Sequence, residues 1–134
     1  MSSNAYLAAD STKIYNGAWG ANTALINYCF TSIPGYSKIG SYLGTGSSTN
    51  TLYTGFEPTF LLVKNTSGAN SWVIFDNKRS TSNPRDEALF PNLSDAEYSY
   101  PNSGVNFNST GFSLTQSTGE VNGSGDTYIF LAIA

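Results

Sequence analysis

The fold is decided by the stretch YTGFEPTFLLVKNTSGANSWVIFDNKR, residues 53–79. It holds two short apolar runs, residues 60–63 and 72–75, whose β-branched and aromatic side chains suit a pleated sheet. A cluster of turn-forming residues, 65–70, separates the runs, and this arrangement predicts a β-hairpin rather than a buried helix. Pro58 has no amide hydrogen to donate, so the first strand is expected to begin at or after it. Because the runs are continuous, both strands are expected in central positions with both faces at least partly covered.

The same signals continue on both sides of this hairpin and predict an all-β chain. Towards the N-terminus, strands are expected at residues 6–9, within 13–19 around the Asn16-Gly17 turn, at 24–30, at 36–43 and at 51–54. Towards the C-terminus, we expect a hairpin over 105–114 and a central strand over 127–133, with 87–90 helical for one turn or irregular. Short strands with turn clusters between them predict a single-domain antiparallel β-sandwich of jelly-roll type.

Length and composition favour one folded domain with a weakly charged surface. The chain has 134 residues, of which 40% are hydrophobic and 14% aromatic, and this supplies enough apolar surface for a core. Only 11% are charged, so Ser, Thr, Asn and Gly provide most of the polarity. We expect residues 1–27 to form an N-terminal arm with the first strands, and residues 28–134 to form the sandwich.

Several classes of function are disfavoured by what the sequence lacks. The net charge of −3 argues against a nucleic-acid binder, and the absence of histidine excludes a Ser-His-Asp triad. Cys29 is the single cysteine, so no intrachain disulfide forms, and its apolar neighbours predict a small buried side chain. No apolar run reaches membrane-spanning length and no signal peptide is evident, so we expect assembly in a cytoplasm without membrane insertion. The basic residues between Lys64 and Arg85, interleaved with acids, predict a solvated ion-pair face.

Carboxylates offer two candidate sites, each with a structural alternative. Asp76 with Asp86 or Glu57 is the pair that glycoside hydrolysis would need. We favour an ion pair for Asp76 at a strand end, because nothing in the spacing fixes two carboxylates together. The available bases are Lys78, Arg79 and Arg85. The segment 120–126, EVNGSGD, alternates oxygen-bearing side chains as calcium loops do, but its low charge favours a glycine-rich hairpin loop. No metal, cofactor or catalytic residue is predicted.

Aromatic side chains are the candidates for contacts with other molecules, since tyrosine and tryptophan anchor interfaces and stack on sugars. Most are expected in the core or between subunits. Tyr98 and Tyr100 stand beside loops and are the best candidates for a binding face, and Trp19, Asp76 and Arg79 complete the set of candidate interface or glycan contacts.

A series of motifs adds a resemblance that covers residues 28–134. The N-terminal half contributes YCFTS (28–32), GYSKIGSY (35–42), GTGS (44–47), YTGFEP (53–58), Lys64, WVIFD (72–76) and Arg79. The C-terminal half contributes LSDAE (93–97), Phe107, GF (111–112), NGSG (122–125) and TYIF (127–130). In this order they resemble a domain of unknown function that recurs in virion proteins of tailed phages, especially marine phages, often appended to tail fibres. The chain departs from the family pattern at Thr31, where members often carry His, and at Ile39, where many carry Phe.

The resemblance implies a non-enzymatic virion component and supplies no catalytic residues. We therefore expect a structural protein on the surface of a tailed phage, in a head decoration, a fibre or a tail fibre. It would bind other virion proteins and associate with itself, with a trimer favoured. A module that binds host surface glycans is the alternative, and a glycoside hydrolase is less favoured. The sequence leaves the position on head or tail open.

Overall fold

The computed structural model describes residues 7–9, 14–16, 28–100 and 104–134. These residues form strands and connecting loops, and no helix occurs among them. The strands are β1 (Leu7–Ala9), β2 (Ile14–Asn16), β3 (Ser37–Leu43), β4 (Asn50–Tyr53), β5 (Phe60–Asn65), β6 (Trp72–Asp76), β7 (Glu87–Ala88), β8 (Tyr98–Ser99), β9 (Val105–Asn108), β10 (Gly111–Leu114) and β11 (Thr127–Ile133).

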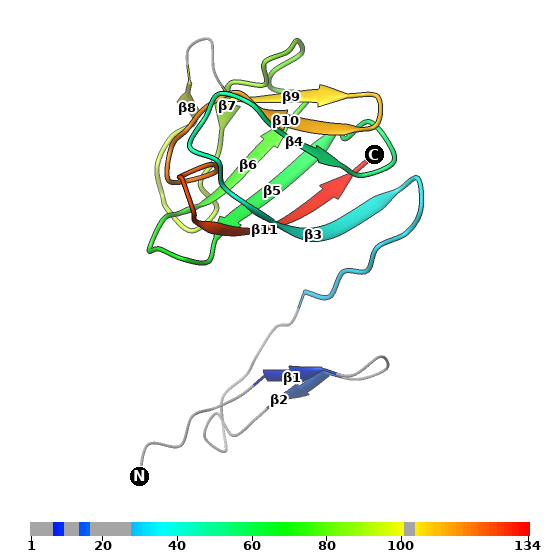
Figure 1. Cartoon of the computed structure of the whole chain (residues 1–134). Helices are drawn as coiled ribbons and strands as arrows, with labels where there is room; N and C mark the ends of the chain where they lie inside the picture. The colour runs from blue at the N-terminus through cyan, green and yellow to red at the C-terminus, as the bar shows by residue number, and fades with distance from the viewer. Residues whose placement is uncertain (1–6, 10–13, 17–27, 101–103) are drawn as a thin grey trace.

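Two antiparallel sheets make up the body of the domain. One has the strand order β3-β11-β5-β6 and the other has the order β4-β10-β9. Figure 1 shows the three-stranded sheet stacked on one face of the four-stranded sheet. The predicted antiparallel β-sandwich is therefore confirmed, and β11 is central as expected. Two smaller pairs, β1-β2 and β7-β8, complete the described strands.

The hairpin predicted over residues 60–75 is β5-β6. Leu61 faces Phe75 and Val63 faces Val73 across it, and all four side chains are fully buried between the two sheets. The expectation that both strands are central is wrong for β6, which lies at the edge of its sheet. A single backbone bridge, in which Ile74 and Leu89 exchange hydrogen bonds of 2.9 and 3.1 Å, covers part of this edge.

The core lies between the facing surfaces of the two sheets. Alternation along each strand sends every second side chain inward, as the two-residue period of a strand requires. The four-stranded sheet contributes Tyr42, Leu61, Val63, Val73, Phe75, Tyr128, Phe130 and Ala132, and the three-stranded sheet contributes Val105, Phe107, Phe112 and Leu114. Each fully buried large side chain stabilises the fold by about 1.5–3 kcal/mol. Phe112 and Phe130 meet edge-to-face across the layers, with ring centroids 5.3 Å apart.

One buried amide, Asn122, ties together the loops at one end of the sandwich. Its Oδ1 accepts hydrogen bonds from the Thr45 amide at 2.9 Å and from Asn50 Nδ2 at 3.0 Å. Its Nδ2 donates to the Ser47 carbonyl at 2.7 Å and to the Gln116 carbonyl at 3.0 Å. The β3–β4 loop and the β10–β11 loop are therefore held by a single side chain that is fully buried.

The predicted turn at Asn16-Gly17 extends outside the described residues; Asn16 itself ends β2, which pairs with β1. Three local expectations need correction. The strand expected at 24–30 is not formed at 28–30, and 24–27 lie outside the described residues. Cys29, expected to be buried, is exposed because no strand pairs with its segment. Residues 87–88 form β7, paired with β8, instead of a helical turn.

Candidate interaction surface

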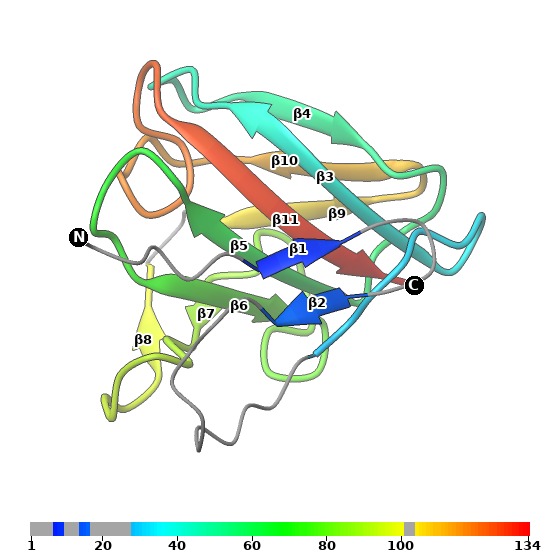
Figure 2. The ribbon, with the colours of Figure 1, turned by 90° about the horizontal axis from the view of Figure 1, so that it is seen from below.

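The face of the four-stranded sheet that points away from the sandwich is largely apolar. Four aliphatic residues lie side by side across all four strands, because Leu131 of β11 faces Ile39 and Leu62, and Leu62 faces Ile74. In the neighbouring row, Ile129 lies next to Lys64, and Lys64 faces Trp72. We call the surface formed by Ile39, Leu62, Trp72, Ile129 and Leu131 the outer face; Figure 2 views the sheet from this side.

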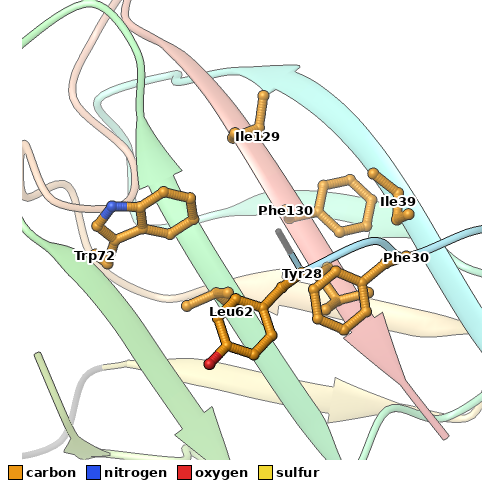
Figure 3. Close-up of a pocket in the computed structure, with 8 residues that line it drawn as sticks. Tyr28, Phe30, Ile39, Leu62, Trp72, Ile129 and Phe130 are labelled. Carbon is orange, nitrogen blue, oxygen red and sulfur yellow. The ribbon is translucent and has the colours of Figure 1, made fainter. Parts of the chain in front are cut away.

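The segment that precedes β3 crosses the outer face and forms a hollow with it. Tyr28 and Phe30 line this hollow together with the outer face and Phe130, and its volume is about 440 Å³. Figure 3 shows the aromatic rings gathered over β3, β11 and β5, with Trp72 at the β6 side. A Ser32 hydroxyl that accepts a 3.0 Å hydrogen bond from the Ile39 amide fixes the segment beside β3. The hollow is therefore formed by the sheet on one side and by the segment that precedes β3 on the other.

Two charged side chains of the described residues belong to this side of the sheet. Lys64 lies between Ile129 and Trp72, and its Nζ donates a 2.6 Å hydrogen bond to the Asn70 carbonyl at the hairpin turn. Asp76, at the end of β6, forms an ion pair with Arg79, with Nε and Oδ2 2.6 Å apart. Asp76 is therefore offset by the charge of Arg79, whereas Lys64 keeps its positive charge because the Asn70 carbonyl is neutral.

The Asp76 carboxylate has a structural role, because it is held by hydrogen bonds within the chain. Its Oδ1 accepts hydrogen bonds from the backbone amides of Lys78 and Arg79, both at 2.9 Å. Burial raises the pKa of Asp76, but these amides, the Arg79 side chain and its positive charge outweigh burial and leave the pKa below its usual value. Arg79 also donates to Glu97 at 2.8 Å, which connects β6 to the segment before β8. The expected ion pair at this strand end is found, with Arg79 as the base.

The other acids considered as catalytic or metal-binding candidates either accept hydrogen bonds within the chain or stand exposed on a loop. Asp86 Oδ1 accepts a 2.9 Å hydrogen bond from the Ser80 hydroxyl, and Glu57 stands exposed in the loop before β5. In the 120–126 loop, Asp126 Oδ2 accepts a 2.9 Å hydrogen bond from the buried Asn65. Across the described parts of the chain, no three His, Cys, Asp or Glu side chains are grouped to hold a metal. The loop is fixed by Asn122 and Asp126 as a glycine-rich connection.

The structure brings four of the five predicted contact residues towards one corner. Tyr98 and Tyr100 meet edge-to-face with centroids 4.7 Å apart, and Glu97, the neighbour of Tyr98, receives Arg79, which holds Asp76. Tyr98 is 52% exposed, whereas Tyr100 packs against the core. Burial, with the nearby charges of Glu120 and Tyr98, raises the pKa of Tyr100 to about 12. Trp19 lies outside the described residues.

The predicted solvated face of mixed charges is wrong for Arg85. This side chain is 8% exposed, donates to the Ser80 carbonyl at 2.8 Å and stacks over the Phe107 ring at 5.5 Å. The outer face, in contrast, was not identified from the sequence. Its signal was present in the continuous apolar runs at 60–63, 72–75 and 128–133, because a strand with one water-facing side would alternate.

A family model described as a domain of unknown function, DUF7483, matches residues 2–134, which takes in residues 2–27 as well as the sandwich. No curated protein and no solved structure gives a significant match. Within the described residues, no helix has the length and apolar character needed to cross a membrane.

Proposed function

The chain belongs to the DUF7483 family of domains of unknown function, and from that premise we propose that it is a structural, non-enzymatic building block of a tailed-phage virion. The outer face carries this proposal, because it is a broad apolar surface outside the core, with Asp76 at its end paired to Arg79. Contiguous exposed apolar surface of this kind marks interaction sites in soluble proteins. The protein acts by associating with itself and with other virion proteins.

The assignment to a phage particle draws its support from the resemblance of the quoted motifs to virion domains. The sandwich adds a compatible physical character. Its few charged groups make its surface contacts less dependent on salt and pH than those of a highly charged protein. The protein is made in the host cytoplasm and is incorporated there into the particle, on the head or the tail.

Two measurements test this proposal together. Mass spectrometry and antibody labelling of purified virions are expected to find the protein on the particle surface. Analytical ultracentrifugation of the isolated protein is expected to find a homo-oligomer, with the trimer as the favoured form. A protein that is absent from purified particles and monomeric at high concentration contradicts the proposal.

Glycan recognition is a second candidate, favoured by the corner that contains Tyr98. A half-exposed aromatic ring beside Glu97 and Arg79 offers the stacking surface and the charged hydrogen-bonding groups that sugar binding uses. We expect a glycan array probed with the wild-type protein to give hits that Tyr98→Ala abolishes and Tyr53→Ala keeps. Tyr53 is a matched control because it is exposed on β4 of the other sheet. An array without hits contradicts this candidate.

A further inference from the structure

We propose that copies of this chain turn their outer faces towards one another around a shared symmetry axis, with Tyr28 and Phe30 as the anchoring side chains between them. The inference rests on the proposed self-association and adds the surface that carries it. Its basis is the juxtaposition of an apolar sheet face, the hollow above it and two aromatic side chains that are only partly used within one copy.

The segment that precedes β3 lies over the sheet without burying its own aromatic rings, Tyr28 and Phe30. Leu131, in the middle of the outer face, is only 8% exposed. Tyr28 and Phe30 line the hollow, yet they remain 81% and 58% exposed. One side of each ring therefore contacts the hollow while the rest stays in water. A second layer of apolar surface is needed to remove these rings from water.

A second copy of the chain is the occupant that the extent of the apolar surface favours. Asp76 pairs with Arg79 of the same chain, whereas Lys64 keeps its positive charge and directs its Nζ to the Asn70 carbonyl at the hairpin turn. The outer face fits itself, because equivalent patches meet in an oligomer with the same face turned to the symmetry axis.

The size of the exposed patch matches the centre of a specific interface. The exposed fractions of the side chains concerned are 81% for Tyr28, 58% for Phe30, 41% for Ile129, 39% for Ile39 and 36% for Trp72. With about 150–250 Å² for a large aromatic side chain, they leave roughly 500 Å² per copy in water. A stable interface buries about 800 Å² per partner, of which the apolar centre is one part and a polar rim the remainder.

Sedimentation of the full chain over a range of concentrations tests the surface directly. The wild-type protein is expected to be oligomeric. The double variant Tyr28→Ser/Phe30→Ser and the single variant Ile129→Lys are each expected to raise the dissociation constant about tenfold or more, because anchoring aromatics and an uncharged centre are lost. Two controls away from the outer face, Tyr53→Ser on β4 and Ser109→Lys in the β9–β10 turn, are expected to keep the wild-type oligomer.

The outcomes separate this inference from the proposed function. If the wild-type protein is oligomeric and the outer-face variants associate as tightly as Tyr53→Ser, the interface lies elsewhere and only the present inference is overturned. If the wild-type protein is monomeric at the highest concentration, the present inference fails, and the proposed function fails with it when the protein is also absent from purified particles. Hydroxyl-radical footprinting of the wild-type protein needs no variant. Tyr28, Phe30 and Trp72 are expected to become protected as concentration rises while Tyr53 is not, and equal reactivity at all concentrations overturns the inference.

Discussion

Replacement of Asn122 by alanine is expected to destabilise the domain far more than its single side chain would suggest. The change removes the hydrogen bonds to Thr45, Ser47, Asn50 and Gln116 at once. Thr45 and Ser47 are exposed, so water can replace the lost partner there at a cost of a few tenths of a kcal/mol to about 1 kcal/mol each. The Gln116 carbonyl belongs to a buried residue, and leaving it unpaired costs about 1–3 kcal/mol. The total is about 3 kcal/mol.

Urea denaturation and calorimetry measure this effect. For a domain of this size, about 3 kcal/mol corresponds to a melting temperature lower by roughly 10 °C. Asn108→Ala is the matched control, because Asn108 is exposed and donates one 2.9 Å hydrogen bond to Ser113 at the β9–β10 hairpin. Its change is expected within about 0.5 kcal/mol. If Asn122→Ala costs no more than Asn108→Ala, the buried amide does not hold the two loops together and the reasoning is refuted.

A second variant at the same position separates lost hydrogen bonds from lost volume. Asn122→Asp keeps the acceptor for Thr45 and Asn50 but loses the donor to Ser47 and Gln116. Burial without a cation raises the pKa of such a carboxyl in the folded state, so its protonated form is favoured there. The stability of this variant relative to the wild type is therefore expected to recover as pH falls and to be lost as pH rises through the raised pKa. A difference from wild type that is constant with pH contradicts this explanation.

Three further predictions concern other positions. The folded state lowers the pKa of Asp76, so its carboxylate stabilises the fold above the pKa of the unfolded state, and this stabilisation is lost as pH falls through the pKa of the folded state. Asp76→Asn is therefore expected to lower the free energy of unfolding by up to about 1 kcal/mol at pH 7 and to leave it unchanged in strong acid. Urea denaturation at several pH values measures this. Gly104→Ala is expected to cost about 3 kcal/mol by urea denaturation, because φ is +136° and a Cβ would overlap the Arg85 carbonyl, whereas Gly35→Ala, at φ +73° with open space, is expected to cost about 1 kcal/mol. Tyr100→Phe is expected to remove a phenolate absorbance step near pH 12, and loss of a step near pH 10 instead contradicts the burial argument.

The sequence by itself determined the class of the fold and most of its strands. The runs at 60–63 and 72–75, the turn cluster between them and the apolar run at 127–133 fix β5, β6 and β11 because local pattern and turn chemistry are enough to do so. The two-residue period of the strand at 36–43 likewise places Tyr42 and Leu43 on opposite faces, while the structure decides that Tyr42 is the buried one. The pairing of Asp76 with Arg79 was also within reach, since the two residues are three positions apart.

Only the tertiary structure decided which strands are neighbours and what the apolar runs face. The order β3-β11-β5-β6 places Ile39, Leu131 and Leu62 in one row, although they are far apart in the sequence. The same order leaves β6 at an edge, and among the described residues the outer side of the sheet is covered by the segment with Tyr28 and Phe30 in place of a second sheet. Arg85 and Cys29 were misjudged for the same reason: burial depends on what other segments bring to a position, and a local window of sequence does not contain those segments.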